Sequence, residues 1–259
     1  MDLSDVSRTA ILTLLRHVNA SEKENVVFND PMAVLCLEKL MSIASVKEKK
    51  WITWQKRLIA TPDARALARR VKTFDNLANL FISKYPKCTV INLARGFDTR
   101  FWRIENKDCR YIEIDLPEVV ALKREILKDQ ISYELIGCSV LNASWIDLVI
   151  TNGNSNFLLL AEGLFMFLSK QDVKNLLQLL TQKLIRSQLV VEIAHEKWTN
   201  SFWKMMFALQ ARVWGLDVSF TFGIKDPRDL ESYAPGLRVL GDVKGSSVGP
   251  IITVSINAA

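Results

Sequence analysis

Apolar residues recur at three- and four-residue spacing through the first 85 residues, which is the period of an amphipathic α-helix. The first stripe of this kind consists of Val6, Ala10, Ile11, Leu14, Leu15 and Val18. A further helix is expected to begin at Thr61, where a capping hydroxyl precedes Pro62 and Asp63, and to end before Pro86. We interpret residues 1–85 as a helical cap on the domain that follows, not as an independent domain.

After Cys88 the pattern changes to short apolar runs that alternate with helical segments. The runs expected to form strands are residues 89–93, 111–115, 157–161, 189–194, 218–222 and 251–256. Helical patterns follow at residues 117–128 and 171–185, and residues 146–150 fit either a strand or a helix. Alternation of this kind predicts βαβ units, and hence an α/β fold with a mostly parallel sheet over residues 86–259.

One amphipathic segment inside this core, at about residues 197–215, is rich in large apolar side chains. They are Trp198, Phe202, Trp203, Met205, Met206, Phe207 and Trp214. Two interpretations are open: a helical lid over an apolar or aromatic ligand, or ordinary packing in the core.

Composition places the chain among ordinary globular proteins, since 49% of its 259 residues are hydrophobic and 24% are charged. The four cysteines lack metal-binding spacing and there are only two histidines, so we expect reduced thiols and no metal site. No apolar run reaches the roughly 18 residues that a membrane span needs, and the amino terminus lacks a signal-peptide pattern. We therefore expect a cytoplasmic protein with no membrane partner.

The net charge of +6 is dispersed along the chain, and its densest basic stretch is residues 47–57, which includes Trp51 and Trp54. A nucleic-acid or membrane-surface patch is one interpretation of such a stretch. We favour a solvated helix whose tryptophans pack inward, because Glu48 interrupts the run and no nucleic-acid motif accompanies it. Nucleic acid is therefore not an expected partner.

Candidate chemistry lies directly after three predicted strands, where ligands bind in an open parallel sheet. The first segment is N-L-A-R-G-F-D-T-R at residues 92–100, in which Gly96 permits positive φ and close approach of the backbone to a ligand. In this segment Asp98 either contributes to the site or caps the next helix.

Two acids follow the next strands. Asp115, about twenty residues after the glycine turn, stands where a carboxylate holds the hydroxyls of a nucleotide ribose. Its alternative role is a helix N-cap, since Glu118 lies three residues later. Glu162 is costly to bury without a partner, so we expect it to face the cleft. Ser169 and Asp172 then make a capping box for the following helix.

Together these segments resemble the leucine carboxyl methyltransferase family, in particular its bacterial branch of polyketide-type O-methyltransferases. The family motif N-L-G-x-G-x-D-T-R corresponds to residues 92–100, E-x-D-x-P to residues 113–117, and A-E-G with its hydrophobic run to residues 161–169. Residues 7–10 and 28–31 and Arg70 match as well, so the resemblance covers about residues 5–195. It implies a Rossmann-like class I methyltransferase with a seven-stranded, mostly parallel sheet and S-adenosylmethionine as cofactor.

The resemblance also implies roles at the amino-acid end of that cofactor. Arg70, with Arg8 as a weaker candidate, would pair with the methionine carboxylate. Ala94 and Gly96 would let the backbone pass beneath the cofactor. Glu162 would lie beside the amino group, as a partner of opposite charge.

At the nucleoside end, the resemblance places Asp115 at the ribose hydroxyls and Ser139 and Val140 beside the adenine, with Asp98 in the same binding segment. Two departures from the family pattern stand out. Ala94 stands where the family has the first glycine of the turn, and the bulky Arg95 follows it. Alanine is expected there only with negative φ. Ser139 stands where the family has an acid, and both changes would weaken cofactor binding.

His195, just after the predicted strand 189–194, is the candidate general base for a hydroxyl acceptor, and its alternative is an ordinary surface histidine. A carboxylate acceptor needs no base, and His17 is expected to be structural.

The sequence thus predicts an O-methyltransferase, monomeric or homodimeric, acting on a hydroxyl or carboxyl group of a small apolar or aromatic, polyketide-like metabolite. The alternatives are a carboxyl methyltransferase of a protein C-terminus and a non-catalytic subunit with the same fold.

Overall fold

Four helices precede the first strand in the computed structural model, which describes residues 5–22, 29–59, 61–105, 108–150, 156–213, 218–244 and 248–257. The helices are α1 (Asp5–Ser21), α2 (Pro31–Ile43), α3 (Val46–Leu58) and α4 (Thr61–Lys84). The start of α2 has a local cause: Asp30 caps it by accepting from the Ala33 N–H, and Pro31 occupies the first turn. Helices expected from periodicity therefore precede the first strand in the described residues.

Seven strands form one sheet in the order β3-β2-β1-β4-β5-β7-β6. They are β1 (Thr89–Leu93), β2 (Arg110–Asp115), β3 (Glu134–Gly137), β4 (Phe157–Ala161), β5 (Ser187–Glu192), β6 (Leu237–Lys244) and β7 (Pro250–Ile256). Pairing is parallel from β3 to β5, whereas β7 is antiparallel to both of its neighbours. The strand order reverses between β1 and β4, and ligands bind at such a switch point, beyond the carboxyl ends of the strands.

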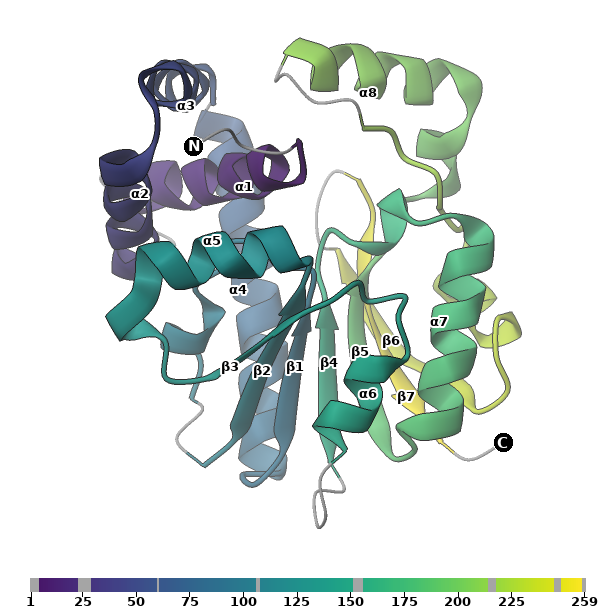
Figure 1. Ribbon diagram of the computed structural model, residues 1–259. Coiled ribbons are helices and arrows are strands. Elements are labelled where there is room, and N and C mark those ends of the chain that lie inside the picture. The colour runs from purple at the N-terminus through teal and green to yellow at the C-terminus, as the bar shows by residue number, and fades with distance from the viewer. Residues whose placement is uncertain are drawn as a thin grey trace.

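Helices cover both faces of the sheet (Figure 1). After β1 they are α5 (Pro117–Leu127), α6 (Ser144–Val149), α7 (Lys170–Lys183) and α8 (Ser201–Val213). Short 3₁₀ segments lie at Arg100–Trp102, Lys128–Gln130, Phe165–Phe167, Glu196–Thr199 and Pro227–Ser232. The central strands β1 and β4 are buried at every position, as expected for strands packed on both faces.

The cap shares its hydrophobic core with the sheet domain. Ile11 and Leu15 of α1 belong to the same buried cluster as Phe97, from the turn after β1, and Leu122 of α5. In Figure 1, α1, α2 and α3 gather at the carboxyl ends of β1 and β2, and α4 runs along the sheet. The cap therefore packs directly on the edge at which the candidate motifs lie.

Three sequence expectations for secondary structure need correction. The segment 218–222 is not a strand; it crosses the end of the sheet, where the Thr221 N–H donates to the Met166 carbonyl. Strands β3 and β6 were not expected, because β3 is a short edge strand and β6 is exposed along most of its length. The ambiguous segment 146–150 belongs mostly to helix α6.

Two surface helices bear on further expectations. In α3, Trp51 packs against the cap core but Trp54 is 48% exposed, so the inward packing expected of both tryptophans is wrong for Trp54. In α8, Phe202, Met205 and Leu209 are each half exposed or more, whereas Phe207 stacks on Phe220 and Ala211 is fully buried. The helix therefore contributes to the core and also presents an apolar surface. Phe28 and Trp214 lie outside the described residues. Among the described helices, none has the length and apolar character needed to cross a bilayer.

Candidate active site

The turn after β1 has a left-handed backbone at two positions. Ala94 has φ 49° and Gly96 has φ 56°, so the expectation of negative φ at Ala94 is wrong. The Ala94 N–H donates to the Ile114 carbonyl on β2 at 2.7 Å, which holds alanine in a conformation that costs it roughly 1–2 kcal/mol. The turn is therefore strained at Ala94 and held in place by the neighbouring strand.

Gly96 is required by packing as well as by its φ. A Cβ atom at this position would lie 2.5 Å from the Cβ of Ala10 on α1, far inside van der Waals contact. Helix α1 therefore rests directly on the turn, and any ligand above Gly96 has to share that space with α1.

Asp115 ends β2 and holds this turn from the other side. Its carboxylate accepts the Gly96 N–H at 2.6 Å and the Leu116 N–H at 2.8 Å. The N-cap of α5 is Leu116, so the alternative role of Asp115 as that cap is wrong. Burial raises the pKa of Asp115, and the two N–H donors offset part of that rise. The side chain stays half-buried at the carboxyl edge of the sheet.

Glu162 follows β4 and is fully buried. Arg70 Nε lies 2.8 Å from one carboxylate oxygen, and Arg100 Nη2 lies 2.6 Å from the other. Arg95 approaches the second oxygen at 3.2 Å and also donates to the Glu162 carbonyl at 2.7 Å. This buried acid has partners of opposite charge that come from the protein itself, so its carboxylate does not face an open cleft as expected.

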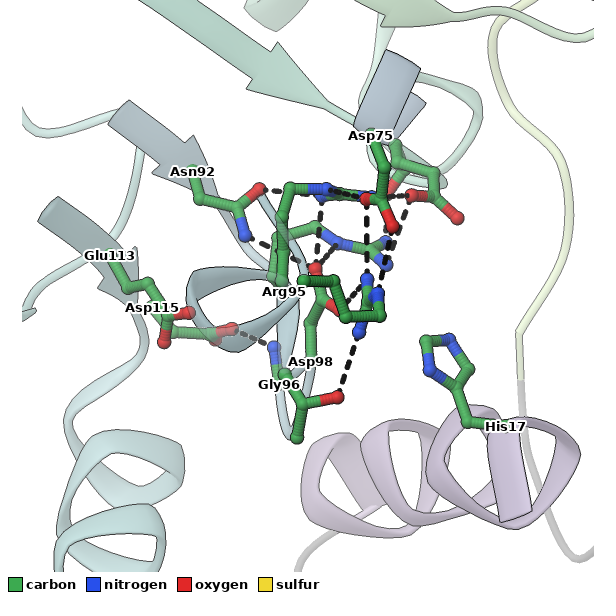
Figure 2. Close-up of polar contacts among 12 residues, drawn as sticks. His17, Asp75, Asn92, Arg95, Gly96, Asp98, Glu113 and Asp115 are labelled. Carbon is green, nitrogen blue, oxygen red and sulfur yellow. Dashed lines mark hydrogen bonds and ion pairs between the residues drawn. The ribbon is translucent and has the colours of Figure 1, made fainter. Parts of the chain in front are cut away.

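Asp98 is buried in the same group of charges. It pairs with Arg100 at 2.9 Å, with Arg103 at 3.0 Å and with Arg95 at 3.3 Å. The residue before the 3₁₀ turn Arg100–Trp102 is Thr99, so Asp98 is not the cap of that turn. Figure 2 shows Asp98 and Arg95 on one side of the turn and Asp115 on the other.

These contacts belong to a larger group, which we call the arginine cluster. Its guanidinium groups are Arg70, Arg95, Arg100 and Arg103, and its carboxylates are Asp30, Asp75, Asp98, Glu162 and Glu192. Burial alone would raise the pKa values of Asp98 and Glu162, but the surrounding arginines outweigh it and hold both below their ordinary values. Both carboxylates are therefore ionised at neutral pH.

A buried lysine supports the turn from α5. Lys123 Nζ donates to Glu113 on β2 and, at 2.6 Å, to the Asp98 carbonyl. Burial raises the pKa of Glu113, and the Lys123 charge counteracts that rise. This pair explains the first acid of the E-x-D-x-P segment: Glu113 anchors α5, and Asp115 is left to face the turn.

Other expected site residues lie apart from this group or at its margin. Arg8 pairs with Glu48 at 3.0 Å and lies over the Trp51 ring, so the structure places it against α3 and corrects its expected role at the amino-acid end. Ser139 follows β3, and its hydroxyl accepts the Leu141 N–H. Val140 is buried beside it, and the preceding Cys138 N–H donates to the Asp115 carbonyl, which keeps this segment next to Asp115.

The two histidines occupy different environments. His17 is buried and bonded to Asp30 at 3.1 Å, in keeping with the expected structural role. His195 is exposed, and its Nδ1 accepts the Lys197 N–H at 3.2 Å, which caps the 3₁₀ segment Glu196–Thr199. In the neutral tautomer that makes this bond, the lone pair of His195 is already used.

Comparison with known proteins decides the family. The model of the leucine carboxyl methyltransferase family matches residues 10–181. The chain belongs to the leucine carboxyl methyltransferase family. This confirms the resemblance drawn from the three motif segments.

Curated relatives agree with that assignment. The chain is 33% identical over 180 residues to the tetracenomycin polyketide synthesis O-methyltransferase TcmP of Streptomyces glaucescens, a match covering 69% of this chain and 64% of TcmP. It is 23% identical over 244 residues to the S-adenosyl-L-methionine-dependent methyltransferase dpfgK of Gibberella zeae, a match covering 91% of this chain and 81% of dpfgK. A shorter match is to leucine carboxyl methyltransferase 1 of Bos taurus, which is 34% identical over 68 residues. This match covers 25% of this chain and 20% of the relative. The match to TcmP thus spans less than two thirds of that relative.

Solved structures share the fold. A Thermobifida fusca YX protein assigned as a methyltransferase superposes with TM-score 0.58 at 14% identity, covering 86% of this chain and 94% of that chain. An O-methyltransferase family 2 protein from Planctomyces limnophilus gives TM-score 0.51 at 15% identity, covering 96% and 81%. The Rossmann-like class I methyltransferase fold is confirmed for this family member.

The two ends of a bound S-adenosylmethionine would meet different conditions in this family member. At the nucleoside end, half-buried Asp115 and Ser139 lie next to each other at the edge of the sheet, which suits a ribose and an adenine. At the amino-acid end, both oxygens of Glu162 already contact guanidinium groups, and Arg95 adds a third cation. Asp115 and Ser139 are suitable partners for the nucleoside end, whereas the amino-acid end does not fit the cofactor as it stands.

Four charged residues of this region were not expected from the sequence to have a role: Asp75, Arg100, Arg103 and Lys123. Arg100 ends the N-L-A-R-G-F-D-T-R segment, and its Nε lies 2.7 Å from Asp75 on α4. One feature of the sequence could have indicated this pair: Asp75 lies between the apolar residues Phe74 and Leu77 of the long helix. A charge on the apolar side of a helix needs a partner of opposite charge. Its partner lies 25 residues along the chain, and no local pattern identifies it.

A cavity of about 610 Å³ opens between α2, α4 and the turn after β1. Trp102, Met32 and Leu35 contribute apolar walls, and Asp75 and Arg103 of the arginine cluster form part of its polar lining. Gly96, Asp115 and Glu162 do not line it, so it is separate from the candidate cofactor site.

We expect Ala94→Gly to stabilise the protein by about 1 kcal/mol, because glycine adopts φ 49° without the strain that alanine bears. The free energy of unfolding is measured by urea denaturation. The matched control is Ala121→Gly on the exposed face of α5, which should destabilise by roughly 1 kcal/mol. Loss of stability in both variants would contradict the strained turn.

We expect acid to weaken the arginine cluster. The pKa of Asp98 is lowered by folding, so its contribution to stability is present above its ordinary pKa of 3.8 and disappears as the pH falls toward the lower folded value. Asp98→Asn should therefore be much less stable than the wild type at pH 7, and the difference should shrink below about pH 4. Urea titrations at several pH values measure it, with the exposed Glu125→Gln as control; a difference independent of pH would contradict the assignment.

Proposed function

We propose that the protein is an S-adenosylmethionine-dependent O-methyltransferase that acts on a hydroxyl or carboxyl group of a small, apolar or aromatic, polyketide-like metabolite. Family membership supports methyl transfer, and the names of TcmP and dpfgK support the cofactor and the acceptor class. The P. limnophilus protein was solved in complex with apigenin, which is in keeping with an aromatic acceptor. The observation that carries the proposal is the Asp115 carboxylate, which is held against the glycine turn at the switch point of the sheet.

In this proposal each part of the site has a defined task. Asp115 binds the ribose hydroxyls, and Ser139 with Val140 contacts the adenine. The backbone at Ala94 and Gly96 passes beneath the cofactor, while Arg70 and Glu162 lie at its amino-acid end. Asp98 acts as a positioning residue, because its carboxylate is committed to three arginines. The bound cofactor supplies the methyl group, and the protein mainly supplies proximity and alignment.

The acceptor side is assigned to α8 and the segment before it. The exposed apolar side chains of Phe202, Met205 and Leu209 suit a lid that covers an apolar ligand. His195, six residues before α8, is the proposed base for a hydroxyl acceptor. Accepting a proton at Nδ1 requires the hydrogen bond from the Lys197 N–H to break, whereas a carboxylate acceptor needs no such step.

A carboxyl methyltransferase of a protein C-terminus is the second candidate, supported by the match to leucine carboxyl methyltransferase 1. That match covers 25% of this chain, whereas the match to TcmP covers 69%, so the small-molecule acceptor is favoured. A cytoplasmic protein that is monomeric or homodimeric, with no nucleic-acid partner, completes the proposal.

Calorimetric titration with S-adenosylmethionine tests the proposed cofactor site. The wild type should bind, and Asp115→Ala should bind at least about tenfold more weakly, because hydrogen bonds to a charged group contribute roughly 1.5–3 kcal/mol. The control is Glu118→Ala, on the exposed first turn of α5, which should leave the affinity unchanged. Absence of wild-type binding at millimolar cofactor would refute the proposed function, and unchanged affinity of Asp115→Ala would refute the site.

Transfer of a labelled methyl group to a panel of phenols and carboxylic acids tests His195. For phenols, His195→Gln should lower turnover by about 100-fold, the typical contribution of a general base, while cofactor affinity stays the same. Full turnover of phenols by the variant would remove His195 as the base. If the wild type transfers the methyl group only to carboxylic acids, the acceptor is a carboxyl group and no base is needed.

A further inference from the structure

The Arg95 side chain points inward from the turn after β1 and is 7% exposed. Its guanidinium touches Glu162 twice, at the backbone carbonyl and at one carboxylate oxygen, and it touches Asp98 through Nε. Arg95 stands between Ala94 and Gly96, both with positive φ, in the segment that would pass beneath the cofactor. A side chain from this segment therefore extends to the acid that the proposed function places beside the cofactor's amino group.

Three guanidinium groups already surround Glu162. Arg70 and Arg100 lie 2.8 and 2.6 Å from its carboxylate oxygens, and Arg95 Nη2 lies 3.2 Å from the second oxygen. A ligand ammonium entering here would meet guanidinium groups that already hold both oxygens of Glu162, and like charges repel strongly in a buried site. With Arg95 in this position, the amino-acid end of the site is closed to a zwitterionic ligand.

The carboxylate contacts of Arg95 are among the longest in the arginine cluster, and its shortest bond, at 2.7 Å, goes to the Glu162 backbone carbonyl. Its carboxylate contacts, at 3.2 and 3.3 Å, are longer than those of Arg70 and Arg100 to Glu162, and its buried Nη2 lacks a hydrogen bond of good geometry. If Arg95 leaves, Glu162 keeps Arg70 and Arg100, and the acid gains room for one further donor.

Asp98 also keeps its main partners without Arg95. Arg100 and Arg103 approach it at 2.9 and 3.0 Å, closer than the 3.3 Å contact of Arg95. Withdrawal of Arg95 therefore strands no buried carboxylate, whereas withdrawal of Arg100 would break the contacts that hold Asp75, Asp98 and Glu162 together.

We propose that Arg95 blocks the amino-acid end of the cofactor site, where its guanidinium takes the place of the ligand's ammonium, and that it has to swing away before a zwitterionic cofactor binds. The inference rests on the proposed function and adds a specificity-determining residue to it. Arg95 lowers affinity for ligands that carry the amino-acid moiety and leaves the nucleoside end unaffected.

A pair of ligands separates the two ends of the site. S-adenosylhomocysteine carries the ammonium and carboxylate, whereas 5′-methylthioadenosine has the nucleoside and lacks the amino-acid moiety. By calorimetry, Arg95→Ala should bind S-adenosylhomocysteine about tenfold or more tightly than the wild type, with little change for 5′-methylthioadenosine. Arg95→Met keeps much of the bulk without the charge, and should show a gain of the same sign.

Controls and outcomes distinguish the two levels of the proposal. Arg124→Ala, which removes an arginine that bonds to the Leu135 carbonyl, should leave both affinities unchanged. If the wild type binds S-adenosylhomocysteine and both Arg95 variants bind it equally or more weakly, the blocking role is overturned while the proposed function stands. Equal gains for both ligands would also overturn it, because the effect would not be confined to the amino-acid end.

If neither the wild type nor the variants bind either ligand, the proposed function itself fails. Thermal unfolding of each variant checks that it is folded. If Arg95→Ala does not fold, Arg95→Met provides the test in its place.

Discussion

The ion pairs of Arg100 connect the parts of this structure that the chain separates. This guanidinium is fully buried and contacts Asp75 of the cap, Asp98 of the turn after β1 and Glu162 at the end of β4. Each of these carboxylates would be costly to bury alone, and the arginine would be equally costly without them. The cap, the glycine turn and the central strands therefore have to assemble together, because no one of them buries its charges without the others.

This constraint accounts for much of the geometry of the edge where the cofactor is proposed to bind. Helix α1 packs on Gly96, the β2 backbone holds Ala94 in a left-handed conformation, and Lys123 fixes the back of the turn through the Asp98 carbonyl. The turn is thus held on several sides before any ligand arrives. Such preorganisation favours a site in which alignment is the main contribution of the protein. The exposed apolar face of α8, to which the acceptor is proposed to bind, lies outside the arginine cluster.

Local patterns were sufficient for elements whose environment is uniform. Strands β1 and β4 are buried on both faces and read as continuous apolar runs, and helices α5 and α7 show clear periodicity. The secondary-structure predictions were wrong where neighbouring parts of the fold decide the conformation of a segment. Edge strand β3 and the exposed strand β6 carry weak patterns. Phe220 of segment 218–222 is buried with Met166 and Ala194, without strand pairing. Alternation of apolar and polar residues predicts which side chains are buried, but it does not predict which part of the protein covers them.

By itself the sequence determined the α/β class, the order of most elements and the three motif segments after β1, β2 and β4, since each depends on residues adjacent in the chain. The tertiary structure alone decided which charges meet. Arg95 reaches Glu162 across 67 positions, and Arg8, expected in the same place, lies against Glu48 on α3. A charged residue is equally compatible with many partners along the chain, and only packing brings one of them within a few ångströms and excludes the water that would otherwise screen the pair.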